Sequence, residues 1–95
     1  MKYVVPLSSF ERFFKKLNTK EQDLVRDGLS KFNEFLVSGQ FSSGLGFKKI
    51  NHDKYEFRIN IRLRVILKLE GDIFYLVLVG NHDDVRKYLR NYRGK

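Results

Sequence analysis

One stretch of alternating residues, from Tyr55 to Leu69, constrains the fold of this chain most strongly. Its odd-numbered positions are all aromatic or aliphatic, and its even-numbered positions are polar or charged except for Ile66. Because successive side chains of a β-strand point to opposite faces, this alternation predicts β-structure with one buried face. We expect the opposite face to be basic, with Glu56 as an early carboxylate among the arginines.

A bend at residues 60–62 is predicted to divide this stretch into two antiparallel strands. A three-residue loop pairs Ile59 with Leu63 and keeps the apolar face intact, whereas a two-residue loop would set apolar side chains opposite charged ones. The three-residue loop also places Arg58 opposite Arg64 on the basic face. Like charges in that position repel unless an anion or an acid lies between them.

The rest of the chain supplies further strands and helices. In order, we expect an edge strand over 2–7, helices begun by the capping-box patterns Ser8–Glu11 and Thr19–Gln22, a strand over 47–50, the hairpin, a strand over 73–79 and a helix begun by Asn81 or His82. The strand over 73–79 is apolar on both faces, which is typical of a strand covered on both sides. The loop-like composition of 40–46 is too short for a domain linker.

This order predicts one α+β domain spanning residues 1–95. Two N-terminal helices pack on a largely antiparallel, twisted sheet of four to five strands, and a helix follows at the C-terminus. A hydrophobic content of 42% with nine Phe and five Tyr predicts a folded globule and not a disordered basic tail.

The charge and cysteine content limit the classes of function. A formal net charge of +8 indicates an anionic partner, either nucleic acid or an acidic protein. With no Cys and two His, neither disulfides nor a structural zinc site is expected, and we expect no cofactor. The sequence has no run of about 18 apolar residues and no signal peptide pattern, so we expect a cytoplasmic protein without a membrane partner.

Three segments resemble the RelE/ParE superfamily of toxins from type II toxin–antitoxin systems. They are GLGFKK at 44–49, the hairpin with YEFR and LRVI between 55 and 66, and VGNHDDV at 79–85. The element order is similar over nearly the whole chain, which implies a RelE-like fold. Arg64 matches the arginine that the family keeps best, and Tyr88 matches a placement in RelE, whereas Leu63 and Arg86 depart from the family pattern, as do residues 81–82.

The resemblance to the RelE and YoeB branch implies an mRNA interferase. Such a toxin is an endoribonuclease that enters the ribosomal A site, among mRNA and rRNA, and cuts mRNA with the neighbouring 2′-hydroxyl and without a metal. It also implies a cognate acidic antitoxin, with the toxin monomeric alone and hetero-oligomeric with that partner. The chemistry needs a base for the 2′ proton, cations for the charged phosphorane and an acid for the leaving 5′-oxygen.

Five residues are candidates for this chemistry. Arg64 and Arg58 suit the phosphorane, because a guanidinium is always charged and binds phosphate oxygens in pairs. Glu56 is the candidate base, His82 the candidate acid or base, and Tyr88 is placed to stack on a base or assist proton transfer. Candidates for contacts with the RNA backbone are Lys48, Lys49, Arg62 and Lys68.

Each catalytic candidate also has a plainer explanation. Arg58 and Arg64 are alternatively solvated residues of an exposed face, so that replacing Arg64 would leave the fold intact. Glu56 can simply neutralise its basic neighbours, His82 can cap a helix or end a turn, and Tyr88 lies on an apolar helix stripe typical of core residues.

Three other functions stay open. A ParE-like member would inhibit DNA gyrase, and such chains usually lack the acid–base residues. A non-enzymatic RNA-binding domain would carry aromatic side chains on the basic face, whereas here they fall mostly on the buried positions. A catalytically inactive toxin that only binds its antitoxin is the third alternative, and it would produce no new RNA ends.

Overall fold

A computed structural model describes residues 2–39 and 46–92 of the chain. Its elements are β1 (Tyr3–Pro6), α1 (Ser8–Lys15), α2 (Thr19–Ser38), β2 (Lys48–Asn51), β3 (Lys54–Arg58), β4 (Arg64–Glu70), β5 (Ile73–Gly80) and α3 (His82–Tyr92). The fold is α+β, as the sequence predicts, and the order of the elements is the predicted one. Most of the predicted 40–46 loop lies outside the described residues.

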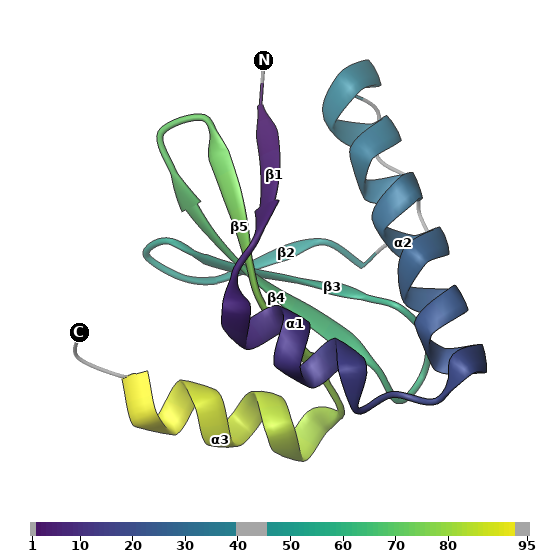
Figure 1. The fold of residues 1–95 in the computed structure, drawn as a ribbon. Coiled ribbons are helices and arrows are strands. Elements are labelled where there is room, and N and C mark those ends of the chain that lie inside the picture. The colour runs from purple at the N-terminus through teal and green to yellow at the C-terminus, as the bar shows by residue number, and fades with distance from the viewer. Residues whose placement is uncertain (1, 40–45, 93–95) are drawn as a thin grey trace.

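Within the described residues the strands form a five-stranded sheet in the order β1-β5-β4-β3-β2. β1 runs parallel to β5, while the other neighbours are antiparallel. Figure 1 shows the twist of the sheet, with α2 along one side and α3 below it. β1 is an edge strand. Proline has no backbone N–H, and an edge strand tolerates it because one side of the strand has no neighbour to receive a hydrogen bond.

The hairpin between β3 and β4 has the predicted three-residue loop. Arg58 is the cross-strand partner of Arg64, and the backbone N–H of Ile59 donates to the carbonyl oxygen of Leu63 at 2.9 Å. The register of β3 against β4 is the predicted one. Strict alternation determines it, because a slip of one residue would turn the buried side chains to the opposite face. The even-numbered residues therefore share one face of β3 and β4, as predicted, but Glu56 and Ile66 on that face are buried.

Phe32 of α2 lies at the centre of the larger core. Its ring stacks on Phe57 with the centroids 4.9 Å apart, and it meets Phe74 edge-on at 5.4 Å. Phe47 stacks on Tyr55 at 5.3 Å beside them. Aromatic pairs of this kind add about 0.5–1.5 kcal/mol each beyond the area they bury, so they anchor α2 to the sheet.

A smaller core lies on the other face of the sheet, under α3. Ile66 of β4 and Leu78 of β5 are buried there against Val85 of α3, with Leu89 packed at the side. Both faces of β5 are thus covered, as its apolar sequence predicts. The same face of β3 and β4 also carries Glu56, beyond the edge of this apolar cluster.

The capping boxes predicted for α1 and α2 are both wrong. α1 has Leu7 at its N-cap position and no side-chain cap, because the Leu7 N–H bonds to β5 and the chain passes directly from β1 into the helix. α2 is capped one residue earlier than predicted, by Asn18. Its Oδ1 accepts from the N–H of Glu21 at 2.8 Å, and Glu21 Oε1 accepts from the Asn18 N–H at 3.1 Å. Gly39 ends α2 with φ of 75°, a left-handed conformation that glycine adopts without strain.

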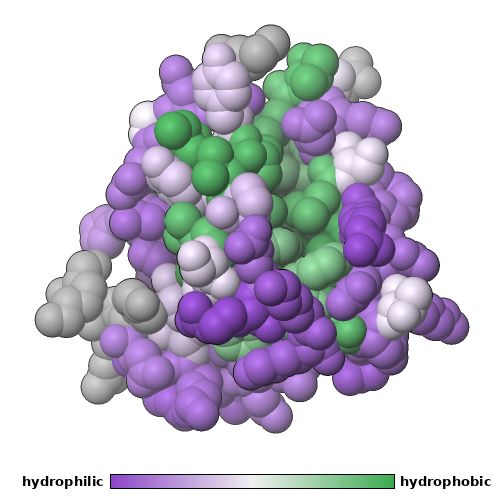
Figure 2. Space-filling view, in the orientation of Figure 1, coloured by the Kyte–Doolittle hydropathy of each residue, from purple (hydrophilic) through white to green (hydrophobic). Residues whose placement is uncertain are grey.

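Polar and apolar side chains gather on different parts of the surface. Figure 2 shows apolar side chains around β1 and between β1 and α2, while hydrophilic side chains cover the lower part over α1 and α3. The exposed apolar residues include Tyr3, Val5 and Val37. No helix within residues 2–39 and 46–92 is long and apolar enough to cross a membrane.

Candidate active site

A hollow of about 440 Å³ lies between the sheet and α3, and it brings together three of the predicted catalytic residues: Glu56, Arg64 and His82. They come from β3, β4 and the first turn of α3. The remaining lining residues are Lys48, Lys49, Ile50, Val85, Arg86 and Leu89. Cations outnumber the single carboxylate in this lining, so the hollow suits an anionic ligand.

An ion pair between Arg64 and Glu56 forms the floor of the hollow. Arg64 Nη1 lies 3.0 Å from Glu56 Oε2, and Lys48 Nζ approaches the same oxygen at 3.6 Å. The Glu56 side chain is 8% exposed and that of Arg64 is 23% exposed. The expectation of an exposed Arg64 is therefore wrong, because the arginine is drawn inward to compensate a buried carboxylate.

Arg64 is held beside the start of α3 by its pairing with Gly80, its partner on β5. A Cβ atom at Gly80 would lie 2.7 Å from Asp84 Cβ, so only glycine leaves room for that side chain. Asp84 Oδ2 accepts from the Asn81 N–H at 3.1 Å, and Asn81 Oδ1 accepts from the Asp84 N–H at 2.9 Å. This capping box confirms Asn81 as the helix start and places His82 at the rim of the hollow.

Two predicted arginines lie outside this hollow. Arg58 is exposed opposite Arg64 and forms no ion pair with any residue that the structure describes. Arg62 has its Nη1 3.7 Å from Glu21 Oε2 and lines a separate hollow of about 260 Å³ near the start of α3. Arg62 thus has an acidic neighbour on α2, although its own side chain is 68% exposed.

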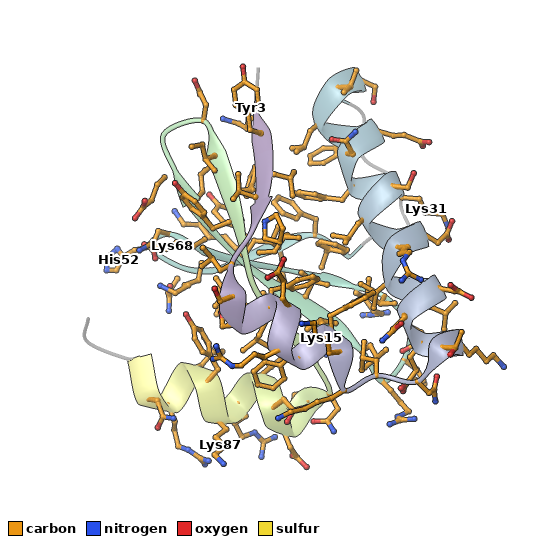
Figure 3. The ribbon with its side chains drawn as sticks, viewed as in Figure 1. Tyr3, Lys15, Lys31, His52, Lys68 and Lys87 are labelled. Atoms are coloured by element: carbon orange, nitrogen blue, oxygen red, sulfur yellow. The ribbon has the colours of Figure 1, made fainter. Side chains whose placement is uncertain are left out.

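Tyr88 and Lys68 also lie apart from Arg64. They line a hollow of about 550 Å³ between α1, α3 and the β2–β3 turn. Lys68 Nζ lies 2.9 Å from Glu70 Oε2, and this hydrogen bond raises the pKa of Lys68 above its ordinary value. Figure 3 shows Lys68 near His52, at the end of the sheet away from the β3–β4 hairpin. In this arrangement Tyr88 does not join Glu56, Arg64 and His82.

Arg86 lines the hollow although it was not among the predicted site residues. It follows His82 by four positions, and side chains at that spacing on a helix share one face. Once His82 is a candidate, the helical spacing alone would have indicated Arg86. Ile50 is also part of the lining, but an isolated apolar residue on a short strand carries no such signal.

The five-stranded mixed sheet with its N-terminal helices and C-terminal helix is the fold of solved structures of RelE-like toxins. No protein-family model matches the chain, and no curated protein matches its sequence. The likeness is therefore one of structure.

Several solved toxin structures share this fold. YafQ from E. coli strain BL21(DE3) has a TM-score of 0.67 at 10% identity, covering 90% of this chain and 98% of that one. A chain of the RelB-RelE antitoxin-toxin complex from Methanococcus jannaschii has a TM-score of 0.66 at 17% identity, covering 88% and 96%. A metal-bound toxin from Helicobacter pylori has a TM-score of 0.65 at 16% identity, covering 90% and 99%. These likenesses confirm the predicted RelE-like fold.

Proposed function

We propose that this chain is the toxin of a type II toxin–antitoxin system and acts as a ribosome-dependent mRNA endoribonuclease. The observation that carries the proposal is the buried Arg64–Glu56 pair, which shares one basic hollow with His82. Cleavage through a 2′-hydroxyl requires a cation that binds the phosphate, a base and an acid. The guanidinium of Arg64, the carboxylate of Glu56 and the imidazole of His82 can supply these groups in one hollow.

The proposed chemistry begins when a phosphate of the RNA enters the hollow. A guanidinium has five N–H donors, so Arg64 can bind the phosphate while its hydrogen bond to Glu56 is weakened or exchanged. The Glu56 carboxylate then accepts the 2′ proton, and the 2′-oxygen attacks the phosphorus. Arg64, with Arg58 beside it, stabilises the phosphorane, and His82 gives a proton to the leaving 5′-oxygen.

Other basic residues contribute binding in this proposal. Lys48 and Lys49 line the same hollow and contact the RNA backbone, while Arg62 and Lys68 lie farther along the surface. Tyr88 keeps a supporting role at most, because it lines a different hollow. The site of action is the ribosomal A site, with mRNA and rRNA as partners, in the cytoplasm.

An acidic antitoxin is the proposed protein partner. Two solved structures with this fold are described as complexes, the E. coli DinJ-YafQ toxin-antitoxin complex and the RelB-RelE antitoxin-toxin complex. The net charge of +8 on this chain suits an acidic, partly disordered segment that covers the hollow. We expect a small acidic protein to be encoded beside this one, and co-expression with it to restore growth.

Mapping transcript ends in cells that express the chain tests the proposal. We expect new 5′ ends within translated codons, absent when translation initiation is blocked, and absent with Arg64→Ala. Growth arrest with no new RNA ends, accompanied by loss of DNA supercoiling, would instead indicate a gyrase inhibitor. A chain that does neither but still binds its antitoxin would be a catalytically inactive toxin.

A further inference from the structure

The loop of the β3–β4 hairpin holds an apolar side chain out in solvent. Ile61, at the centre of this three-residue loop, is 91% exposed, more than the other large apolar residues that the structure describes as exposed. Tight turns favour Gly, Asn, Asp and Ser, and a β-branched apolar residue gains nothing there from burial. The position of Ile61 therefore has no explanation in the stability of the fold.

Hydrogen bonds hold the loop in one conformation. Asn60 Oδ1 accepts from the backbone N–H groups of Arg62, at 2.9 Å, and Leu63, at 2.8 Å. The Ile59 N–H donates to the Leu63 carbonyl oxygen below them. Since both ends of the loop are fixed in this way, Ile61 is presented to a partner with little conformational entropy left to lose.

Helix α2 supports both arms of the hairpin. Ile59 lies so close to Gly28 that a Cβ atom there would meet Ile59 Cδ1 at 2.5 Å. On the other arm, Arg62 forms its ion pair with Glu21 in the first turn of α2. The loop thus lies against the longest of the helices on both of its arms.

Two arginines flank Ile61 in the sequence, and the guanidinium of one of them, Arg64, is turned toward Glu56 in the hollow beside α3. Arg58 and Arg64 lie three residues before and after Ile61, on directly opposite strand positions. At about 3.3 Å per residue, each is within about 10 Å of Ile61 along the chain. Arg58 is exposed, so its guanidinium can reach a phosphate near this end of the hairpin.

We propose that Ile61 packs against a nucleobase of single-stranded RNA while Arg64 and Arg58 hold an adjacent phosphate. The inference rests on the proposed function and adds a substrate-positioning residue to it. Isoleucine and other apolar side chains are known to enter base steps and separate stacked bases. A base moved off its neighbour frees the sugar to rotate, which brings the 2′-oxygen into line with the phosphate held by Arg64.

The matched test compares Ile61→Thr with Val37→Thr. Both changes replace an exposed β-branched apolar side chain with a polar β-branched one, and Ile61→Thr also removes the δ-methyl group. Val37 is 74% exposed at the end of α2, far from the hairpin loop. Ile61→Ala removes more of the side chain, and Ile61→Leu keeps an apolar one. Thermal unfolding of all four variants should stay close to the original, because none of the changed side chains is buried.

The substrate is a programmed ribosome whose mRNA carries 2-aminopurine beside the cut and a 2′-deoxy sugar at the cut. We expect the original chain to raise the 2-aminopurine fluorescence by unstacking the base. Ile61→Thr and Ile61→Ala should abolish that rise and slow cleavage of the ordinary mRNA roughly tenfold or more, as expected for the loss of a base contact. Ile61→Leu should keep most of both signals, and Val37→Thr should keep all of them.

A second experiment, binding of the variants to ribosomes without mRNA, shows whether the base belongs to mRNA or to rRNA. Weaker binding there with Ile61→Thr, and an unchanged cut-site pattern, would assign the base to rRNA; a changed pattern with normal binding would assign it to mRNA. Full activity of Ile61→Thr and Ile61→Ala beside an active original chain overturns the inference alone, as does a defect confined to antitoxin binding. An original chain that neither cuts nor binds ribosomes overturns the proposed function itself.

Discussion

Arg64 and Gly80 face each other across β4 and β5, so the arginine lies at the point where the sheet ends and α3 begins. The pairing sets the guanidinium next to His82 without any direct bond between the two side chains being needed. On its other side Arg64 meets Glu56. The candidate site is therefore assembled by strand register and by the start of one helix, both of which can be tested by substitution.

Arg64→Ala should abolish growth arrest and also lower the free energy of unfolding by about 1–3 kcal/mol, because Glu56 then keeps a buried charge without its closest partner. Arg64→Lys should restore activity only in part, since an ammonium cannot bind two phosphate oxygens in the guanidinium geometry. Growth assays and denaturant titrations measure the two effects. Adding Glu56→Gln to Arg64→Ala should recover stability but not toxicity. Full toxicity of Arg64→Ala and of Arg64→Lys would refute the role of Arg64.

Glu56→Gln and His82→Gln should each slow cleavage by about 10²- to 10⁴-fold, while binding to the ribosome stays nearly unchanged. Because both groups act on one transition state, the double variant should lose less than the product of the two effects. Single-turnover cleavage on programmed ribosomes measures these rates.

Tyr88→Phe is the comparison for these two variants, and it should have a much smaller effect because Tyr88 lines the hollow between α1 and α3. If Tyr88→Phe is crippling and Glu56→Gln is harmless, the acid–base assignment is wrong.

Lys48→Ala should weaken binding to RNA and reduce the slope of log affinity against log salt by about one counterion, since each lysine–phosphate contact releases about one. Binding titrations at several salt concentrations measure the slope. Lys31→Ala is the control: Lys31 lies on α2 and pairs with Asp27 at 3.2 Å, away from the hollow. Equal slopes for the two variants would remove Lys48 from the RNA interface.

Asp53 should make stability depend on pH in acid. The hydrogen bond from Lys54 Nζ to Asp53 Oδ1, at 3.1 Å, holds the pKa of Asp53 below its ordinary 3.8. Its stabilising contribution is complete above that ordinary value and is lost as the pH falls through the lower folded pKa. Thermal melts between about pH 2 and pH 6 should therefore show a shallower acid loss for Asp53→Asn. Lys54→Gln should flatten the same region, and an unchanged profile in both would contradict the assignment.

Gly80→Ala should lower the free energy of unfolding by about 1–3 kcal/mol, because the added methyl group overlaps Asp84, which caps α3. Cleavage should fall as well, since His82 depends on that cap for its place. Denaturant titrations of Gly80→Ala, Asp84→Ala and the double variant form a cycle. We expect the double variant to cost less than the sum of the two, because removing the carboxylate removes its overlap with the added methyl group, while the overlap with Cβ of residue 84 remains.

The sequence predicted those parts of the fold that depend on neighbouring residues in the chain. The hairpin register follows from strict alternation, and Arg58 opposite Arg64 follows from the register. The cap of α2 was misplaced because Asn18 and Thr19 are both good capping residues and their difference in energy is small. The position of Tyr88 could not be derived, since it depends on how α3 rotates about its axis against the sheet, which no local pattern encodes.

The parallel pairing of β1 with β5 determines when the protein can become complete during synthesis. Tyr3 lies beside Ile73, so β1 cannot pair with its neighbour until β5 has been made. Contacts between such distant segments carry a loop-closure cost and slow folding. α3, which closes the Arg64 hollow, emerges later still. The candidate site is therefore complete only once β5 and α3 have both been made and have packed against the rest of the sheet.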